Sequence, residues 1–262
     1  MMNYAAPAYF IKKKPIAWER ITFHGCFSIS MLSVVYLLMT FATGKSWFPM
    51  ISVATNPSEL TLSLLQCVLG TAALFLPLLL QKITKIKMPD SLCAFFYLFI
   101  LCSTVLGEVF SLYYRIPCWD SLLHFSSGIM IGMLGSILIL DFVQRKKCSQ
   151  LITPMMVAVS AVCFALCIGM FWEIYEFAAD SLLGLNMQKF LLQDGTALIG
   201  KAALMDTMKD LIVDFAGALV AAVCAHASIK KQQGWLYRYM ETTPTKAPRR
   251  LLPQSEVYPL AS

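Results

Sequence analysis

Six long apolar runs constrain the fold of this chain more than any other feature. Each run is close to the roughly 20 apolar residues that an α-helix needs to cross the hydrocarbon core of a bilayer. The runs cover residues 21–42, 59–80, 91–113, 121–140, 154–177 and 208–228. Within lipid, a segment of this length satisfies its backbone hydrogen bonds by forming a helix. The sequence therefore predicts an all-α, polytopic membrane protein with six transmembrane helices.

Charge is scarce in this chain, as expected for a protein that lies mostly in lipid. Charged residues make up 14% of the sequence and hydrophobic residues 58%, whereas about 25% of a typical soluble domain is charged. The first run is longer than the apolar core of a cleavable signal, which has about 7–15 residues, so we expect it to remain as an anchor. The nine cysteines contain no CxxC pair, and we expect no disulfide framework.

Basic residues predict the orientation of the chain. Sixteen of the 21 lysines and arginines lie before the first run or after the second, fourth and sixth runs, which places them all on the same side of the membrane. They are Lys12, Lys13, Lys14, Arg20, Lys82, Lys85, Lys87, Arg145, Lys146, Lys147, Lys230, Lys231, Arg238, Lys246, Arg249 and Arg250. Cytoplasmic loops are enriched in Lys and Arg. We therefore expect a multi-pass protein of the bacterial cytoplasmic (inner) membrane with both termini in the cytoplasm. The expected partner is the lipid bilayer, and because the basic residues lie in short loops, no nucleic acid is expected.

The sequence divides into three parts on this interpretation. Residues 1–20 form a cytoplasmic N-terminal segment, residues 21–228 the six-helix transmembrane domain, and residues 229–262 a basic cytoplasmic tail. The tail contains four prolines and is expected to be disordered. Residues 181–204 mix apolar and polar side chains with three glycines. They fit either an amphipathic helix in the outer interface, covering the acidic residues described below, or a plain linker.

Two carboxylates end the fifth run, in the stretch Trp172–Phe177. Glu173 and Glu176 are three residues apart, so they share one face of a helix. A carboxylate at the centre of a transmembrane helix costs about 2.5–3.5 kcal/mol, and less near the interface. Both residues therefore need a proton, a cation, a metal or hydrogen-bond donors as partners.

Acidic residues of neighbouring runs fall at a similar depth. Asp120 and His124 are one helical turn apart at the start of the fourth run, and an acidic stripe of Asp206, Asp210 and Asp214 begins the sixth. At a rise of about 1.5 Å per residue, His124, Asp210 and Asp214 lie within roughly 10 Å of the outer boundary. The sequence thus predicts one acidic layer that contains a histidine.

The packing of the runs is indicated by small residues. Gly128 and Gly132 form a GxxxG pair in the fourth run, which predicts the close approach of another helix.

Two further acidic residues lie at the depth of the acidic layer, Glu108 at the end of the third run and Asp214 in the sixth. The sequence assigns neither of them a role.

Carboxylates combined with an imidazole are a typical ligand set for a divalent cation, because hard cations take oxygen ligands and imidazole suits transition metals. The candidate metal ligands are Asp120, His124, Glu173, Glu176, Asp206 and Asp210. Crowded carboxylates also favour proton transfer, and the candidate catalytic residues are Glu173, Glu176, His124 and Asp210. No Walker loop, HExxH, GxSxG or dinucleotide fingerprint occurs, so no particular reaction is indicated.

Three motifs carry a resemblance to a known family. They are WDSLLHFSSG at residues 119–128, WEIYEF at 172–177 and DTMKDLIVDFAGA at 206–218. In this order the sequence resembles the YjdF-type family of bacterial inner-membrane proteins over about residues 90–228. It is loosely similar to the VanZ-like membrane proteins linked to glycopeptide resistance. The resemblance implies a membrane topology and a shared polar site, and it implies no reaction.

Three functional hypotheses follow from these observations. The first is an outward-facing Asp/Glu/His site that holds a divalent cation and binds or acts on a cell-envelope lipid or its head group, which would need the metal because bare carboxylates repel phosphate. The second is a cation- or proton-coupled transporter that uses the same acids. The third is a non-catalytic membrane protein whose polar residues only lock helices, at roughly 0.6 kcal/mol per interhelical hydrogen bond.

Overall fold

The computed structural model describes residues 18–45, 57–146, 152–192 and 195–237, and it is built from helices. Six segments are long and apolar enough to cross a membrane: Trp18–Thr43, Leu60–Thr84, Asp90–Val109, Trp119–Arg145, Pro154–Leu183 and Met205–Lys230. Across these described ranges there is no β-strand, and one isolated bridge joins Leu191 to Ala197. The all-α class and the six predicted spans are confirmed.

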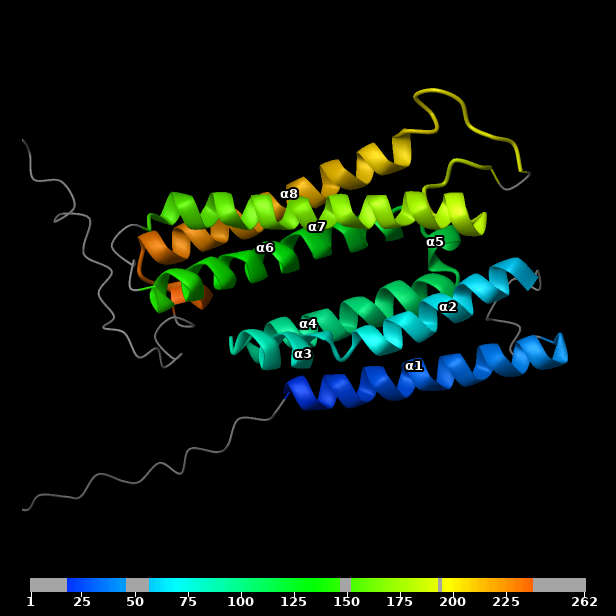
Figure 1. Cartoon of the computed structure of the whole chain (residues 1–262), viewed down its shortest axis with the longest axis horizontal. Helices are drawn as coiled ribbons and strands as arrows, with labels where there is room; N and C mark the ends of the chain where they lie inside the picture. The colour runs from blue at the N-terminus through cyan, green and yellow to red at the C-terminus, as the bar shows by residue number, and fades with distance from the viewer. Residues whose placement is uncertain (1–17, 46–56, 147–151, 193–194, 238–262) are drawn as a thin grey trace, which may run out of the picture.

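The order of the helices follows the six runs (Figure 1). In chain order they are α1 (Trp18–Thr43), α2 (Pro57–Ala73), α3 (Leu76–Thr84), α4 (Asp90–Leu101), the π-helix η1 (Cys102–Val109), α5 (Leu112–Arg115), α6 (Trp119–Arg145), α7 (Pro154–Leu183) and α8 (Met205–Lys230). Thr153 caps α7 by accepting a hydrogen bond from the N–H of Met156, and Pro154 follows as the first helical residue. Proline suits that position because its missing N–H has no intrahelical partner there.

Two of the spans are interrupted. The second is divided into α2 and α3, with a proline, Pro77, in the first turn of α3, where it cannot donate a helical hydrogen bond to the preceding turn. The third changes from α4 to η1, whose wider turns end at Val109. Ser111 then adopts a left-handed conformation with φ of 56° and starts the short helix α5. This turn places α5 beside the beginning of α6 (Figure 1).

Helices α6, α7 and α8 form one closely packed group, beside which α1, α2 and α4 lie. The contact between α6 and α8 is tight because both helices have glycine at the crossing. A Cβ atom on Gly128 would lie 2.3 Å from the carbonyl oxygen of Asp214, and one on Gly217 would lie 2.2 Å from that of Phe125. Further along α6, a Cβ on Gly132 would lie 2.8 Å from the Cβ of Ala221. The close approach predicted from Gly128 and Gly132 is confirmed.

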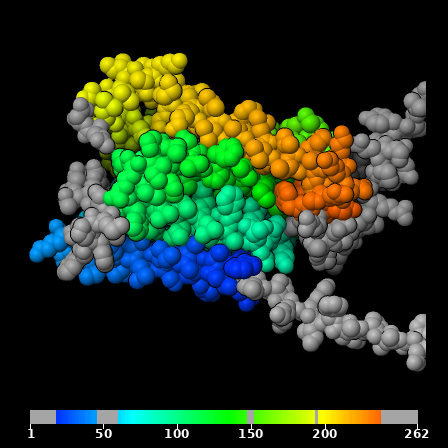
Figure 2. All heavy atoms as spheres, turned by 180° about the vertical axis from the view of Figure 1, so that it is seen from behind, coloured from blue at the N-terminus to red at the C-terminus, as the bar shows by residue number. Residues whose placement is uncertain are grey.

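The two ends of the group formed by α6, α7 and α8 differ in the charge of their residues and in the segment that lies over them. We call the end at which α6 and α8 begin and α7 finishes the acidic end, and the opposite one the basic end. The segment between α7 and α8 (yellow) caps the acidic end, and the residues that follow α8 (orange to red) lie at the other end (Figure 2). At the basic end, Arg145 forms an ion pair of 2.5 Å with Asp141 and donates to the carbonyl of Lys85 at 3.0 Å.

The segment between α7 and α8 is not a helix in its described part. Helix α7 continues to Leu183, beyond the predicted end at residue 177, and Gly184 closes it with φ of 66°. Residues 184–192 and 195–204 then form turns and extended chain. Of the two interpretations of residues 181–204, the interfacial helix is wrong for the described residues 184–192 and 195–204, and the linker agrees with them. Gly184, Gly195 and Gly200 have left-handed φ values, which an α-helix does not accommodate.

Parts of the predicted termini lie outside the described residues, namely residues 1–17 and 238–262. The first residues of the predicted tail contact the bundle. Leu236 is completely buried, and the Tyr237 N–H donates to the Ser228 hydroxyl at 3.1 Å. Figure 1 shows that α1 starts, and that the described chain after α8 ends, on the side of the basic end.

Candidate functional site

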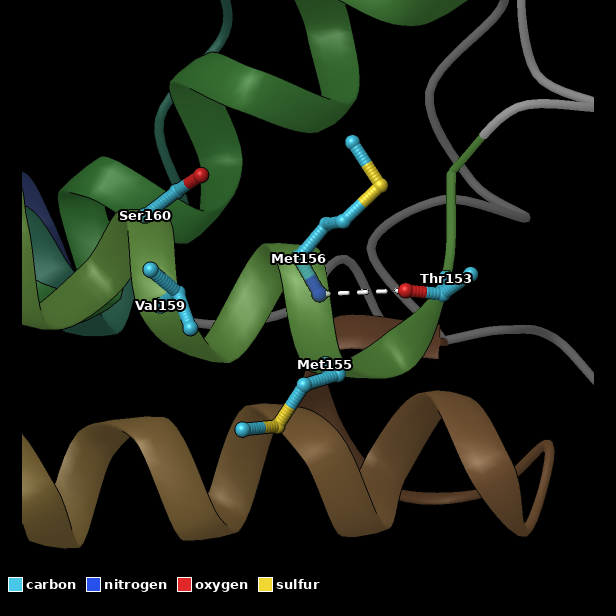
Figure 3. A pocket seen from close by; sticks show the side chains of 5 residues that line it. All are labelled: Thr153, Met155, Met156, Val159 and Ser160. Atoms are coloured by element: carbon cyan, nitrogen blue, oxygen red, sulfur yellow. Dashed lines mark hydrogen bonds between the residues drawn. The ribbon is translucent and has the colours of Figure 1, made fainter.

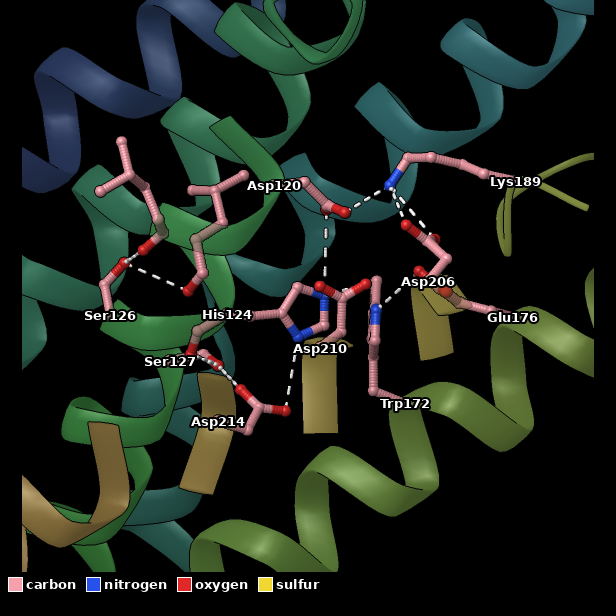
Figure 4. Close-up of polar contacts among 12 residues, drawn as sticks. Asp120, His124, Ser126, Ser127, Trp172, Glu176, Lys189, Asp206, Asp210 and Asp214 are labelled. Atoms are coloured by element: carbon pink, nitrogen blue, oxygen red, sulfur yellow. Dashed lines mark hydrogen bonds and ion pairs between the residues drawn. The ribbon is translucent and has the colours of Figure 1, made fainter. Parts of the chain in front are cut away.

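A single histidine lies among three aspartates at the acidic end of the bundle (Figure 4). His124 is 8% exposed. Its Nε2 atom lies 3.9 Å from Asp120 Oδ1 and 3.9 Å from Asp210 Oδ2, and its Nδ1 atom lies 3.4 Å from Asp214 Oδ2. Asp120 and His124 come from α6, whereas Asp210 and Asp214 come from α8. The imidazole therefore faces carboxylates on both of its nitrogen atoms.

Helix periodicity and close packing bring these residues together. Asp120 and His124 are one turn apart on α6, and Asp210 and Asp214 are one turn apart on α8, so each pair points to one side of its helix. The glycine crossing at Gly128 lies one turn beyond His124 and holds the two helices at backbone contact. Charged side chains near the end of a transmembrane bundle thus face the interior of the group and not its surroundings.

Asp214 is fixed from two sides. Its Oδ1 atom accepts a hydrogen bond of 2.9 Å from the Ser127 hydroxyl. Its Oδ2 atom occupies space left by Gly169 of α7, where a Cβ atom would lie only 2.6 Å away. An ionised carboxylate can only accept hydrogen bonds, so the Nδ1 atom of His124 is the donor to Asp214. In the neutral tautomer with the proton on Nδ1, the lone pair lies on Nε2, which faces Asp120 and Asp210.

Two buried carboxylates of this region have oxygens without hydrogen bonds to any residue that the structure describes. Asp210 is 1% exposed, and its buried Oδ1 atom is one of these oxygens. Glu173, on α7, is 6% exposed, and within the described part of the chain neither of its carboxylate oxygens meets a donor with hydrogen-bond geometry. A buried polar group without a partner costs about 1–3 kcal/mol, and more when it is charged. This cost is a physical reason to expect a cation beside Asp210.

Lys189 is the basic residue of the site. Its Nζ atom contacts Asp120 Oδ2 and lies 3.0 and 3.2 Å from the two carboxylate oxygens of Asp206 (Figure 4). Burial lowers the pKa of Lys189, but the carboxylates of Asp120 and Asp206 outweigh this effect and raise the pKa above its ordinary value. Lys189 is therefore a cation at neutral pH, and it neutralises part of the acidic layer.

The turn that carries Lys189 is held onto the bundle by Asp180 of α7. Asp180 accepts hydrogen bonds from the N–H groups of Met187 and Gln188, at 2.7 and 3.0 Å. The side chain of Gln188 donates to the Thr207 hydroxyl of α8 at 2.8 Å. We call residues 184–192 the strap, because they cross from α7 to α8 over the acidic residues.

Three of the six predicted metal ligands come together. Asp120, His124 and Asp210 each offer an atom within 4.8 Å of the other two. Asp206 lies at the edge of this group, where Lys189 holds it. Glu173, on α7, is not part of this group of three.

Glu176 also lies outside the three-residue group. Its Oε1 atom accepts a hydrogen bond of 2.9 Å from the Trp172 indole N–H (Figure 4).

Tyr113 of α5 lies near Glu176, Asp120 and Glu108. The Tyr113 ring packs on Gly107, where an added Cβ would lie 2.3 Å from the ring. Burial, followed by these carboxylates, raises the pKa of Tyr113 well above its ordinary value. Helix α5 thus forms one wall of the acidic end, with Glu108 behind it.

Sequence reasoning missed three contributors, namely Asp214 as the partner of His124, Ser127 as the donor to Asp214, and Lys189. For Asp214 a signal was present, because it continues the stripe of Asp206 and Asp210 by one turn. For Lys189 there was none, since 69 residues separate it from Asp120.

A depression of about 320 Å³ lies at the basic end of α7. It is lined by Thr153, Met155, Met156, Val159 and Ser160 (Figure 3). None of these side chains titrates, and Met155 is 61% exposed. This surface therefore offers no groups for acid–base chemistry and no carboxylate or imidazole for a hard or borderline cation, in contrast to the acidic end.

Comparisons with known proteins place the chain among membrane proteins without an assigned activity. A family model described as a predicted membrane protein, DUF2238, matches residues 33–231. An uncharacterized protein of Thermotoga maritima is 28% identical over 153 residues, which is 56% of this chain and 68% of that protein. No solved structure matches the chain. The family match includes the whole of α6, α7 and α8.

Proposed function

The chain belongs to the DUF2238 family of predicted membrane proteins, and we propose that this member binds a divalent transition-metal cation between Asp120, His124 and Asp210. The supporting observation is the arrangement of His124. Its Nε2 atom lies 3.9 Å from a carboxylate oxygen of each aspartate, while its Nδ1 atom is directed to Asp214. Histidines that ligate metals almost always donate their second ring N–H to a carboxylate, a carbonyl or water.

The distances suit one bound ion. Zinc–nitrogen and zinc–oxygen bonds are about 2.0–2.2 Å, so two ligand atoms on a tetrahedral ion are about 3.4 Å apart. The two gaps of 3.9 Å to Nε2 are too long for hydrogen bonds. They need to close by only about half an ångström to reach that tetrahedral spacing. Imidazole with two carboxylates favours zinc, manganese or iron over calcium and magnesium, which prefer oxygen ligands alone.

The charge of the surrounding side chains also favours a bound cation. Four carboxylates, those of Asp120, Asp206, Asp210 and Asp214, lie around one lysine and one histidine. Counted with four ionised carboxylates, one charged lysine and a neutral imidazole, the group has a formal charge of −3. If the polar residues served only to lock helices, their buried oxygens would be expected to pair with one another or with donors. The Oδ1 atom of Asp210 has no such partner among the residues that the structure describes.

The proposed role of the ion is to accept an anionic head group. Three protein ligands leave a coordination position open, as in metal sites that act on substrates. We extend the proposal to a cell-envelope lipid whose phosphate would occupy that position. With His124 and Asp210 serving as ligands, Glu173 and Glu176 beside them are the residues proposed to supply or accept protons. We infer that the acidic end faces outward from the bacterial cytoplasmic membrane, that the chain is of the YjdF type, and that residues 21–228 are its membrane domain.

The metal-binding proposal is tested with the purified full-length chain in detergent. After removal of bound ions with a chelator, zinc and manganese are titrated in a calorimeter and the bound metal is measured by elemental analysis. We expect about one ion per chain and a loss of at least tenfold in affinity for Asp210→Asn, since a ligand is lost. Asp141→Asn, a buried aspartate at the basic end that pairs with Arg145, is the matched control. An absence of binding by the wild type, or equal binding by Asp210→Asn, would refute the proposal.

A further inference from the structure

The ammonium group of Lys189 contacts a residue that also belongs to the proposed metal site. Asp120 points its Oδ2 atom at Lys189 and its Oδ1 atom at His124 Nε2, 3.9 Å away. The lysine also contacts both oxygens of Asp206, at 3.0 and 3.2 Å. The ammonium group of Lys189 therefore neutralises the carboxylate of Asp120, which is one of the proposed ligands of the metal ion.

The backbone at Lys189 is in an unusual conformation. Its φ value is 50°, in the left-handed region that residues with a Cβ seldom occupy. Such a conformation persists when surrounding contacts impose it. Here the contacts are the hydrogen bonds from the N–H groups of Met187 and Gln188 to Asp180, the hydrogen bond from the Lys189 N–H to the Asn186 carbonyl, and the ion pairs of the side chain itself. Loss of the ion pairs would remove the restraints that act through the side chain.

The strap has features that allow it to move as a unit. It starts at Gly184, whose φ of 66° ends α7. Within it, the side chain of Asn186 exchanges two hydrogen bonds of 2.9 Å with the backbone of Leu191, so the turn is closed on itself. The Lys189 side chain is 43% exposed, which gives its ammonium a short path to water.

We propose that Lys189 is an internal competitor for the metal ion, and that binding of a divalent cation displaces its ammonium from Asp120 and loosens the strap. This inference rests on the proposed function. A divalent ion on Asp120 Oδ1 repels the neighbouring ammonium and withdraws charge from the carboxylate that holds it. Because the coupling is reciprocal, the position of Lys189 sets the affinity for the ion, and the ion sets the position of the strap.

Two measurements on the full-length chain test the proposal. The first is the affinity for zinc and manganese of Lys189→Gln, with Lys201→Gln as the control, because Lys201 is an exposed lysine of the same segment. We expect Lys189→Gln to bind the ion about fivefold more tightly or better, the lower end of ordinary coupling between sites, and Lys201→Gln to bind like the wild type.

The second measurement follows the strap directly. Lysine acylation is read by mass spectrometry, with Lys201 as the internal reference in the same chain. An ammonium held between two carboxylates reacts slowly, so we expect Lys189 to acylate more slowly than Lys201 without metal and to accelerate when the site is saturated.

The outcomes separate this proposal from the one on which it rests. Metal binding by the wild type and its loss in Asp210→Asn, with no change in Lys189 acylation or in the affinity of Lys189→Gln, would overturn the competitor role alone. Weaker binding by Lys189→Gln would also overturn it, because the lysine would then support the ligand set. If the wild type binds no ion, both proposals fail.

Discussion

The glycine crossing between α6 and α8 gives the most quantitative test of how the fold sets the spacing of the site. In Gly128→Ala, the new Cβ would lie 2.3 Å from the carbonyl oxygen of Asp214, whereas carbon–oxygen contacts in proteins are about 3.3 Å or longer. The two helices must therefore separate by about 1 Å. Forced overpacking of this kind costs about 1–3 kcal/mol, so the protein is expected to fold with a lower melting temperature.

The same separation acts on the ligands, because His124 lies one turn from Gly128 on the same face. The distance of 3.9 Å between His124 Nε2 and Asp210 Oδ2 would increase to about 5 Å. Two atoms bound to one zinc ion can be at most about 4.2 Å apart, even on opposite sides of the ion. We therefore expect Gly128→Ala to lose measurable zinc affinity while remaining folded.

Calorimetric titration and thermal unfolding of three glycine variants separate the two effects. Gly135→Ala overpacks the contact between α6 and α7, where a Cβ would lie 2.8 Å from the Cβ of Phe164, so it should lower the melting temperature and retain metal binding. In Gly25→Ala, within α1, the new Cβ meets no atom of the described residues within 4 Å, so this variant should retain metal binding and should not lower the melting temperature. Unaltered zinc affinity in a destabilised Gly128→Ala protein would refute the reasoning, as would unaltered stability.

Three further predictions concern the surroundings of the site. Gly169→Ala should move the carboxylate of Asp214, because the new Cβ would lie 2.6 Å from its Oδ2 atom. Titration should then show about 10–100-fold weaker metal binding with little loss of stability. Normal affinity would contradict the fixed position of Asp214. Asp214→Asn should weaken binding by a similar factor, and equal affinity would exclude an orienting role. Because the pKa of Lys189 is raised, its ion pairs stabilise the protein fully below the unfolded-state pKa and are lost only as pH rises through the folded-state pKa. The difference in melting temperature between the wild type and Lys189→Gln should thus stay constant between about pH 7 and pH 10; a decrease over this range would contradict it.

The helices could be predicted from sequence because lipid imposes a simple rule. A long apolar run must be helical, and six runs gave six spans. Interruptions within the spans were less visible. Pro77, in the first turn of α3, is a local signal for the division of the second span, whereas residues 102–109 contain no proline or other helix breaker that marks the wide turns of η1 apart from Gly107.

The composition of the site could be predicted in part for a similar physical reason. Residues four apart share a helix face, so Asp120 with His124, and Asp206 with Asp210, could be recognised. Which faces meet depends on helix rotation, and the spacing within a single helix does not contain that information. Glu173 was expected inside the group and lies beside it, and Lys189 reaches Asp120 only because the strap folds back over the bundle.

The most direct test of the account is X-ray absorption spectroscopy of the zinc-loaded, full-length protein. It predicts one imidazole nitrogen and carboxylate oxygens at about 2.0–2.2 Å from the ion, with the imidazole contribution lost in His124→Gln and kept in His24→Gln. A spectrum of zinc surrounded only by water, or an imidazole contribution that persists in His124→Gln, would contradict the claim that His124 is the centre of a metal site.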